Sequence, residues 1–383
     1  MYRIYANGTI LHDPLRVEEG LVVINPILSE KLNTHGSLRF SVAQNNPRYA
    51  DIAPRKTFVK VVSDTQNNKY WFGRVTSVDR GWNGTKSVYC EGELSCLVDA
   101  VYQPFGFKGE PAVLFRRLML HYIVTDIGAT SGYLLRPGTV TVTDPNNYIV
   151  RSSKDPATLW SLLDSALFGT SLGGYVVPRY DKETDTHYVD YLADFDKIST
   201  QTVRFGENLL DFAEHVVADN VITVMYPYGA DLPDTDPDYA PDPPENGSWN
   251  GNRLTIESVN NGHRDIENAD GVALWGRIYG YKIWPEVTIA SNLKSKAEAW
   301  LAQQIWQSIT IEVSAVDLAF VDADIEQIQV GEYVNIESKP HDLKTMLLCT
   351  EKTTHLTQLQ NSVIVLGAGI KTISDLQGSE LKK

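Results

Sequence analysis

The stretch WFGRVTSVDRGWNGTKSVYCEGELSCLVDA, residues 71–100, begins with the pattern of a β-hairpin. In residues 71–78 and again in residues 87–90, β-branched and aromatic side chains lie two apart, which is the period of a strand with one buried face. The pair Asn83-Gly84 lies between the two runs and readily supplies the positive φ angles that a tight turn requires. We therefore expect the two runs to pair with each other.

The hydrophobic period of the same stretch changes after Glu91. Apolar residues then recur at i, i+3 and i+4, which is one face of a helix; they are Leu94, Leu97 and Val98. Gly92 suits the junction between strand and helix, and the acids beside it suit the positive end of a helix. The stretch therefore predicts a sheet edge that continues directly into a helical module.

The composition of the whole chain favours a β-rich protein with several domains. A chain of 383 residues exceeds the usual size of one hydrophobic core, so we expect roughly two to four domains. Eight Trp and 19 Tyr beside only four Met favour strands, because flat and stiff aromatic rings fit pleated surfaces. The formal net charge is −14, and no basic run is longer than Arg116-Arg117, so we expect no sequence-specific binding to nucleic acid.

The cysteines and the N-terminus predict a protein that folds in a reducing compartment. Cys90, Cys96 and Cys349 are odd in number and have no metal-type spacing, so we expect buried thiols and no disulfide framework. The first residues lack the basic start and apolar core of a signal peptide. No run approaches the roughly 18 uninterrupted apolar residues of a membrane span. We therefore expect assembly in a cytoplasm and no membrane-spanning segment.

The hydrophobic period also divides the chain into segments. Short alternating runs in residues 1–98 predict a small barrel or sandwich. Residues 99–198 mix helix and strand patterns and predict an α/β module. Strand patterns return in residues 199–372, and residues 373–383 form a polar C-terminal tail. The predicted fold class is therefore α+β, mainly β with α/β insertions.

Three stretches carry the clearest helix signals. Pro111 can open a helix at its first position, and the apolar stripe that follows is Leu114, Phe115, Leu118 and Tyr122. Asp155-Pro156 predicts a second helix with Asp155 as its N-cap and Gly169 as its end. Residues 287–309 carry the best helix signal of the chain, with Ser291 as a possible cap and an apolar face of Leu293, Ala297, Trp300, Leu301 and Ile305. Residues 173–195 predict a hairpin around a polar turn at 181–186.

One pentapeptide matches an enzyme signature. Gly169-Thr170-Ser171-Leu172-Gly173 has the form G-x-S-x-G, the nucleophile elbow of serine hydrolases, in which a strand turns sharply into a helix. Here a predicted helix precedes the motif and a predicted strand follows it, so the order is reversed. We expect these glycines to end a helix and open a hairpin, and we assign no catalytic residue.

The sequence also predicts no metal or cofactor site. Asp234, Asp236 and Asp238 alternate, with Glu245 at the twelfth position of an EF-hand pattern, but Tyr239 stands where that loop needs Gly and three prolines obstruct the rest. The eight histidines have no metal-binding spacing. Residues 367–369 form a Gly-Ala-Gly turn that is too short for a dinucleotide fingerprint. Carboxylate pairs are so frequent in this acidic chain that no glycosidase pair can be assigned.

Several segments in succession resemble a known family. They are residues 71–100, 167–195, 292–301 and 316–367, with the phrases CEGEL at 90–94 and VGEYV at 330–334. Together they resemble the hub proteins of siphophage tail tips, which are the N-terminal structural modules of tail-associated lysins and prophage endopeptidase tail proteins. Those modules are similar in fold to the baseplate hub of contractile phages. The resemblance covers roughly residues 1–372.

The resemblance implies a fold and a set of partners. It implies a homotrimer in which two β-barrels per subunit, residues 1–98 and 199–372, build a pseudo-sixfold ring. Residues 99–198 and an insertion at about 262–309 would be lateral modules. The implied partners are the distal tail protein, the tape-measure protein, and a tail fibre, receptor-binding protein or lysin. Longer members continue into a peptidoglycan-cleaving or receptor-binding region, whereas this sequence ends at residue 383.

The resulting hypothesis is a structural hub of a bacteriophage or prophage tail tip or baseplate. Such a hub would link and close the tail tube in the virion, connect it to host-facing components during adsorption and DNA delivery, and have no catalytic activity. The alternative is a cell-wall carbohydrate-binding or peptidoglycan-hydrolysing tail protein, which the aromatic residues, strands and scattered carboxylates would suit. A cytoplasmic scaffold unrelated to phage is a third possibility.

Overall fold

The computed structural model describes residues 1–63, 70–125, 132–216, 221–232, 253–306, 309–320, 322, 325–341 and 343–367. The acidic loop with Asp234, Asp236, Asp238 and Glu245 lies outside these residues, as do the C-terminal tail and most of the Gly-Ala-Gly turn. The described part is mainly β, as the sequence predicts.

The N-terminal strands follow one another as antiparallel neighbours. They are β1 (Tyr2–Ala6), β2 (Thr9–His12), β3 (Ile24–Lys31), β4 (Ser37–Val42), β5 (Phe58–Ser63), β6 (Tyr70–Arg80) and β7 (Lys86–Gly92). Their order in the sheet is β3-β4-β7-β6-β5-β1-β2. Alternate side chains of these strands point to one face and bury a core that includes Ile4, Leu38 and Val75.

The predicted hairpin is confirmed. Strands β6 and β7 pair antiparallel from Gly73 opposite Gly92 to Arg80 opposite Lys86. In the turn, Gly84 has φ 75° and the Asn83 side chain accepts a hydrogen bond from Thr85 N, so this pair closes the turn. The chain then enters a helix as expected, but the helix is a six-residue 3-10 helix, η3 (Glu93–Val98), which buries Leu94 and Leu97 and leaves Val98 exposed.

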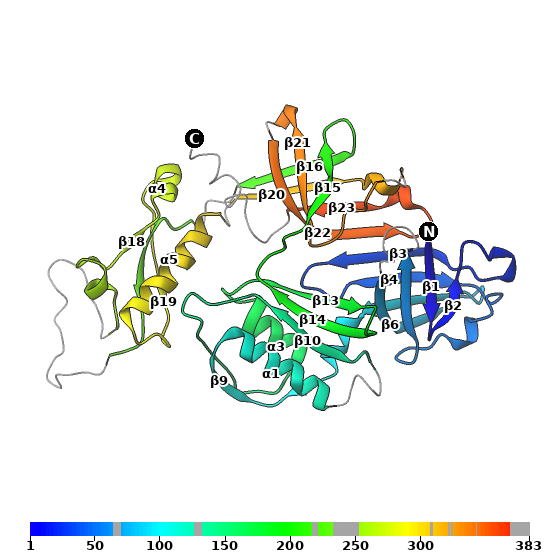
Figure 1. The fold of residues 1–383 in the computed structure, drawn as a ribbon, viewed down its shortest axis with the longest axis horizontal. Helices are drawn as coiled ribbons and strands as arrows, with labels where there is room; N and C mark the ends of the chain where they lie inside the picture. The colour runs from blue at the N-terminus through cyan, green and yellow to red at the C-terminus, as the bar shows by residue number, and fades with distance from the viewer. Residues whose placement is uncertain are drawn as a thin grey trace.

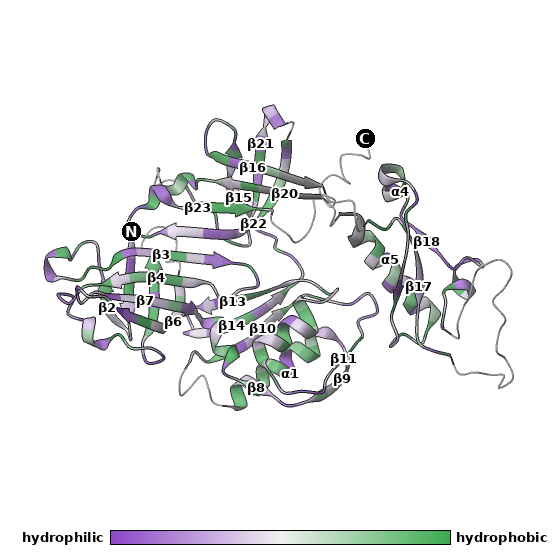
Figure 2. Cartoon of the chain, turned by 180° about the vertical axis from the view of Figure 1, so that it is seen from behind, coloured by the Kyte–Doolittle hydropathy of each residue, from purple (hydrophilic) through white to green (hydrophobic). Residues whose placement is uncertain are grey.

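Residues 101–192 form an α/β region beside this sheet. Its elements are β8 (Val101–Tyr102), β9 (Phe105–Gly109), α1 (Pro111–Val124), β10 (Leu135–Val140), β11 (Ile149–Ser153), β12 (Ala157–Thr158), α3 (Leu159–Leu163), the π-helix η4 (Asp164–Phe168), β13 (Tyr175–Asp181) and β14 (Thr186–Leu192). Strands β10, β14 and β13 form a three-stranded sheet. Helix α1 packs on it through the predicted stripe. Figure 2 shows hydrophobic residues, in green, gathered where α1 lies near β10.

Two predictions for this region have different outcomes. The hairpin of residues 173–195 is confirmed, because β13 and β14 pair antiparallel around the turn at 181–186. The N-cap prediction is wrong. Thr158 caps helix α3 by accepting a hydrogen bond from Ser161 N, while Asp155 and Pro156 lie before β12. The short strand β12 pairs with β8, and this pairing delays the start of the helix.

The C-terminal strands continue the N-terminal sheet. They are β15 (Ile198–Arg204), β16 (Leu209–Val216), β20 (Ile309–Ala315), β21 (Tyr333–Ser338), β22 (Leu343–His355) and β23 (Val363–Leu366). Strand β22 pairs with β21 through its first half and with both β23 and β3 through its second half. Figure 1 shows β22 between β23 and β3. One long strand therefore joins both ends of the chain in one sheet.

This continuity corrects the expectation of two separate barrels. The strands form one 13-stranded sheet, and no barrel closes among the residues that the structure describes. Alternation identifies a strand and its buried face, but every strand offers the same row of N–H and C=O groups. The sequence pattern therefore carries no information on the pairing between β22 and β3.

Residues 224–306 form a smaller layer that we call the α5 unit. Its elements are β17 (Val224–Tyr228), η5 (Glu257–Val259), β18 (Ile266–Glu267), α4 (Ala269–Trp275), β19 (Tyr279–Ile283) and α5 (Ala290–Trp306). Helix α5 covers one face of the β18-β17-β19 sheet and buries Leu293, Ala297 and Leu301 of the predicted face. Trp300 of that face is partly buried, and the side chain of Ile305 lies outside the described part of the structure. In Figure 1 the α5 unit stands apart from the long sheet and from α1.

Candidate functional site at the module junction

The N-terminal sheet, the α/β region and the C-terminal strands meet in a small buried cluster. Leu32 follows β3, Tyr175 lies on β13 and Leu348 lies on β22, and all three are buried against one another. Partly buried residues that pack on them are Val177, Phe195, Val330 and Tyr333. Burial of these apolar surfaces holds three distant parts of the chain together, and we call this place the junction.

Two polar side chains extend the junction by bonding to backbone groups of a neighbouring element. Asn33 accepts a hydrogen bond from Val176 N at 2.8 Å and donates to Gly174 O at 3.0 Å, so its amide pairs with β13 as a strand would. Tyr133, just before β10, directs its hydroxyl at Gly73 O at 2.9 Å and Val59 O at 3.2 Å. Both contacts satisfy backbone or side-chain groups that water cannot easily reach.

A buried ion pair connects the opening hairpin to the segment that follows it. Arg74 on β6 is 1% exposed and pairs with Asp99, just after η3, and it also donates to Ser95 O at 3.1 Å. Arg55 reaches the same carboxylate at 2.6 Å. Burial by itself raises the pKa of Asp99, but hydrogen bonds from Arg74 and Arg55 outweigh burial and leave this pKa below its ordinary value. The carboxylate therefore stays ionised between two guanidinium groups.

A second buried pair lies beside the first. Glu93 Oε2 is 2.5 Å from His187 Nδ1, and Glu93 is 5% exposed. Burial raises the pKa of Glu93, and the bond to His187 opposes this shift. The His187 ring packs against the rings of Phe72, Tyr133 and Tyr180, with centroids 4.6 to 5.0 Å apart. The pair thus joins η3 to β14 inside an aromatic shell.

The C-terminal strands contain a third buried charge pair. Lys352 Nζ on β22 is 2.9 Å from Asp317 Oδ2, and these residues are 1% and 0% exposed. Asp317 also accepts hydrogen bonds from Gln201 Nε2 at 2.6 Å and from Ile328 N at 3.1 Å. Each oxygen of the buried carboxylate therefore has partners, as burial of a charge requires.

The junction encloses a cavity of about 460 Å³. Its walls come from the end of β3 and the loop after it, from β6, from β13 and from the segment around Gln329. Tyr70, Trp71, Phe72 and Tyr180 contribute aromatic rings. Two of the lining residues also have a buried polar atom without a hydrogen-bond partner; these atoms are His35 Nε2 and Gln329 Oε1. Charged residues lie among these rings in the lining, including Lys31, Glu93 and Lys197. We call this space the junction cavity.

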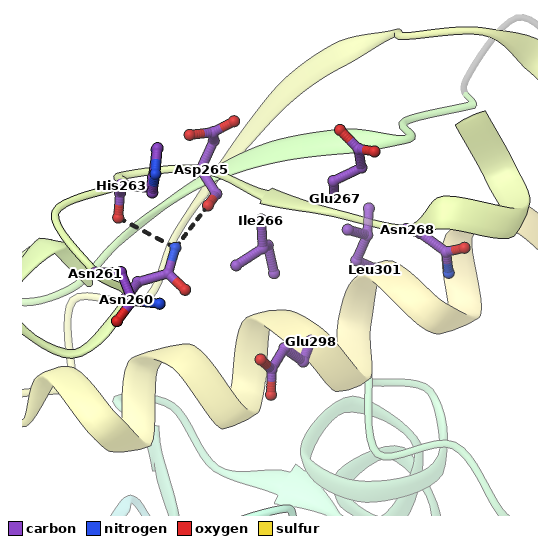
Figure 3. Close-up of a pocket in the computed structure, with 9 residues that line it drawn as sticks. All are labelled: Asn260, Asn261, His263, Asp265, Ile266, Glu267, Asn268, Glu298 and Leu301. Atoms are coloured by element: carbon purple, nitrogen blue, oxygen red, sulfur yellow. Dashed lines mark hydrogen bonds between the residues drawn. The ribbon is translucent and has the colours of Figure 1, made fainter. Parts of the chain in front are cut away.

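A second pocket of about 380 Å³ lies between α5 and the segment 260–268. Figure 3 shows that Ile266 points toward α5, while Asp265 and Glu267 point to the other side. The Asn260 amide donates to the carbonyl oxygens of His263 and Asp265, so it is already satisfied. Glu267 pairs with Arg277 at 2.7 Å. The acids of this pocket therefore do not converge on one point.

The hydrolase-like motif has the geometry of a turn. Gly169 ends η4, Gly173 has φ 61°, and β13 begins at Tyr175. Ser171 thus lies between a helix and a following strand, which is the reverse of a nucleophile elbow, as the sequence predicts. Within the described ranges, no group of three or more His, Cys, Asp or Glu residues is arranged to hold a metal ion. Cys90, Cys96 and Cys349 are buried, as expected.

Sequence reasoning missed the junction and the buried charge pairs because their members are far apart in the chain. Glu93 and His187 are 94 positions apart, and Asp317 and Lys352 are 35 apart. The burial of Lys352 had a sequence signal, because this lysine lies at an inward position of an alternating strand. Thr350 and Thr354, two positions away on either side, are also buried. A lysine at such a position requires a buried anion, although the pattern does not say which acid supplies it.

One protein family and several solved structures are similar to this chain. Residues 197–377 match the family described as prophage endopeptidase tail. No curated protein sequence matches the chain. No described helix is long and apolar enough to cross a membrane.

Three solved structures share the fold along nearly their whole length. A prophage MuSo2 43 kDa tail protein from Shewanella oneidensis has a TM-score of 0.58 at 12% identity, covering 95% of this chain and 97% of its own. A tail protein from Neisseria meningitidis MC58 has a TM-score of 0.57 at 12% identity, with 95% of each chain covered. Prophage tail protein gp18 from Listeria monocytogenes EGD-e has a TM-score of 0.54 at 14% identity, covering 94% and 92%. The resemblance to prophage tail proteins is therefore confirmed.

Proposed function

We propose that this chain is the structural hub of a bacteriophage or prophage tail tip or baseplate. The observation that carries the proposal is the shared fold with prophage tail proteins, which runs over more than nine-tenths of this chain. The family match at residues 197–377 supports it independently. The chain acts by assembly and shape, and not by catalysis.

The proposed assembly is a homotrimeric ring in the virion tail. Residues 1–98 and 199–372 form its two β modules, and residues 99–198 and about 262–309 form its lateral modules. The pairing of β22 with β3 supports this plan, because it holds the two β modules of one chain in a constant relation. The buried pairs Arg74–Asp99 and Glu93–His187 support it in the same way for the first lateral module. A ring that carries load during adsorption requires rigid subunits.

The proposed partners are other tail components. The ring binds the distal tail protein on one side, encloses or contacts the tape-measure protein, and carries a tail fibre, receptor-binding protein or lysin on the other side. The net charge of −14 suits a channel that DNA traverses without binding, because the like charge removes attraction from counterion release.

The mass of the purified chain in solution tests this proposal. A hub assembles to three times 42.8 kDa or to larger rings, and images of these particles have threefold symmetry. An assay on purified cell walls provides the complementary test. A chain that stays a monomer at every concentration, or that degrades walls by itself, would contradict the hub and favour the wall-active alternative.

A further inference from the structure

The sheet of the α5 unit has one face that no helix covers in the described structure. Helix α5 covers the other face, where Met225 and Ile266 belong to the shared core. Because side chains alternate along a strand, the neighbours of Met225 and their partners on β19 point away from α5. These outward residues are Tyr226 and Tyr228 on β17 and Tyr279, Tyr281 and Ile283 on β19. We call this surface the tyrosine face.

The tyrosine face is open to solvent in the single chain. Tyr279 and Tyr281 are 55% and 70% exposed, and the Tyr226 ring stacks on Tyr279 with centroids 6.0 Å apart. Among the described strands β19 pairs only with β17, so it is an edge of its sheet. Tyrosine is enriched in protein interfaces because its ring gives a large and stiff contact area. The tyrosine face therefore has the composition of a docking surface.

The tyrosine face points away from the α/β region of its own chain. On α5, Lys296 Nζ lies 3.5 Å from Asp144 Oδ1, and the Asn292 carbonyl accepts a hydrogen bond from the Asn146 side chain at 3.1 Å. Figures 1 and 2 both show α5 on the side of its sheet that faces the α/β region. The opposite side of the sheet can therefore meet a surface of the α/β region only when a second chain supplies it.

Helix α1 in the α/β region presents an exposed surface that is apolar and basic. Its residues recur every three or four positions on the side opposite the buried stripe, and they are Val113, Arg116, Arg117, Leu120 and Val124. Arg117 donates to the Tyr102 hydroxyl at 2.7 Å, whereas Arg116 has no ion pair with any residue that the structure describes. No basic run of this chain of net charge −14 is longer than this arginine pair. We call this surface the α1 outer face.

The charges of the two surfaces are complementary. Asp265 and Glu267 point to the same side of the sheet as the tyrosine face (Figure 3). Glu267 pairs with Arg277, but within the described ranges the Asp265 carboxylate has no ion pair. Burial raises the pKa of Tyr226 and the Asp265 charge raises it further, so this carboxylate lies at the edge of the tyrosine face. A guanidinium group pairs with a carboxylate and also stacks on a tyrosine ring, so an arginine-bearing helix face fits this surface.

We propose that the tyrosine face of one chain binds the α1 outer face of a second copy of the chain. The inference rests on the proposed hub, because a ring is built from contacts in which two different surfaces of each subunit meet. In this contact Arg116 lies beside Asp265 of the neighbouring copy, and Leu120 and Val124 cover the tyrosine rings. The two lateral modules of each subunit thus hold its neighbours.

Self-association of designed variants tests the proposal. Tyr281→Ala removes the most exposed ring of the tyrosine face, and Arg116→Glu places a negative charge opposite Asp265. Each change should weaken assembly about tenfold or more, as measured by sedimentation equilibrium over a range of concentrations. Combining Arg116→Glu with Asp265→Arg reverses both charges and should restore assembly. Phe205→Ala and Arg80→Glu, at exposed positions outside both surfaces, are the matched controls and should leave assembly unchanged.

Cross-linking between two kinds of chain shows which surfaces meet. Chains with Tyr281→Cys are mixed with chains with Leu120→Cys and treated with a bismaleimide reagent. The proposal predicts a covalent pair that contains one chain of each kind. Chains with Tyr281→Cys should not cross-link to one another, because the contact joins two different surfaces. The native cysteines are buried, so they do not compete for the reagent.

Several results would overturn the inference. One is assembly of Tyr281→Ala or Arg116→Glu as tight as that of the native chain, which leaves the hub in place and puts its contacts elsewhere. Another is a charge-reversed double variant that assembles no better than Arg116→Glu alone. Mixed chains that do not cross-link, or Tyr281→Cys chains that cross-link to one another, would also exclude this contact, and the latter would indicate a symmetric dimer. A native chain that stays a monomer contradicts the hub as well.

Discussion

The junction and the α5 unit are stabilised in opposite ways. At the junction, distant segments share one apolar cluster, and the buried pairs Arg74–Asp99 and Glu93–His187 lie beside it. The α5 unit has its own core around Leu293 and Leu301, and polar contacts through Lys296 and Asn146 link it to the α/β region. From this difference we expect the main body to unfold as one cooperative unit and the α5 unit to unfold separately.

The largest expected effect is in the main body. Asp317→Ala leaves Lys352 buried without its partner, and we expect a loss of about 3–5 kcal/mol in the free energy of unfolding. Urea unfolding measures the loss, and hydrogen exchange should show faster exchange throughout β15, β21 and β22. Asp51→Ala, in an exposed pair with Arg48, is the control and should change stability by less than about 0.5 kcal/mol. Equal effects of the two changes would contradict a cooperative main body.

The second effect tests the independence of the α5 unit. Leu301→Ala removes a side chain that is 2% exposed, so we expect a loss of about 2–4 kcal/mol within this unit. Hydrogen exchange should accelerate in α5, β17 and β18 and stay unchanged in β3 and β22. Leu210→Ala, at a position that is 56% exposed, is the matched control. Faster exchange in β22 of the Leu301 variant would show that the two regions unfold together.

The third effect concerns pH and falls on the main body. Because the pKa of His35 is about 4 in the folded chain against 6.5 ordinarily, the unfolded chain binds more protons between these values. Stability is therefore lost as pH falls from about 6.5 to about 4, by roughly 2–3 kcal/mol for this residue. Burial lowers the pKa of His12 too, in the same direction. Urea midpoints across this range should fall less steeply in His35→Gln, and an unchanged slope would refute the assignment to His35.

The smallest effect concerns the polar attachment itself. Lys296 Nζ lies 3.5 Å from Asp144 Oδ1 and 3.4 Å from Glu286 Oε1, so Lys296→Ala weakens the link between α5 and the segment around Asp144. Because this pair is largely buried but its contacts are long, we expect a loss of about 1–2 kcal/mol and faster hydrogen exchange near residues 142–147 only. Lys294→Ala on the same helix, 3.9 Å from Glu298, is the control. A loss as large as that of Asp317→Ala would mean that this contact is part of the main core.

The local elements could be predicted from the sequence, and the site could not. The hairpin of residues 71–92 and helix α1 have strong local patterns, since alternation and the i, i+3, i+4 spacing report which face is buried. The start of helix α3 was predicted three residues too early, because the pairing of β12 with β8 overrode the Asp-Pro signal. The junction cavity has no local pattern, since His35 and Gln329 carry no spacing that relates them.

The sequence by itself determined the hairpins of residues 71–92 and 173–195, the apolar stripe of helix α1 and the likeness to phage tail proteins. Those properties depend on neighbours within a few positions, where backbone geometry repeats with a known period. Only the tertiary structure decided that β22 joins β3, that Arg74, Glu93 and Lys352 find their partners, and that a cavity lies among three regions. The physical reason is that hydrogen-bonding edges and buried charges accept many partners, and packing of the whole chain selects one.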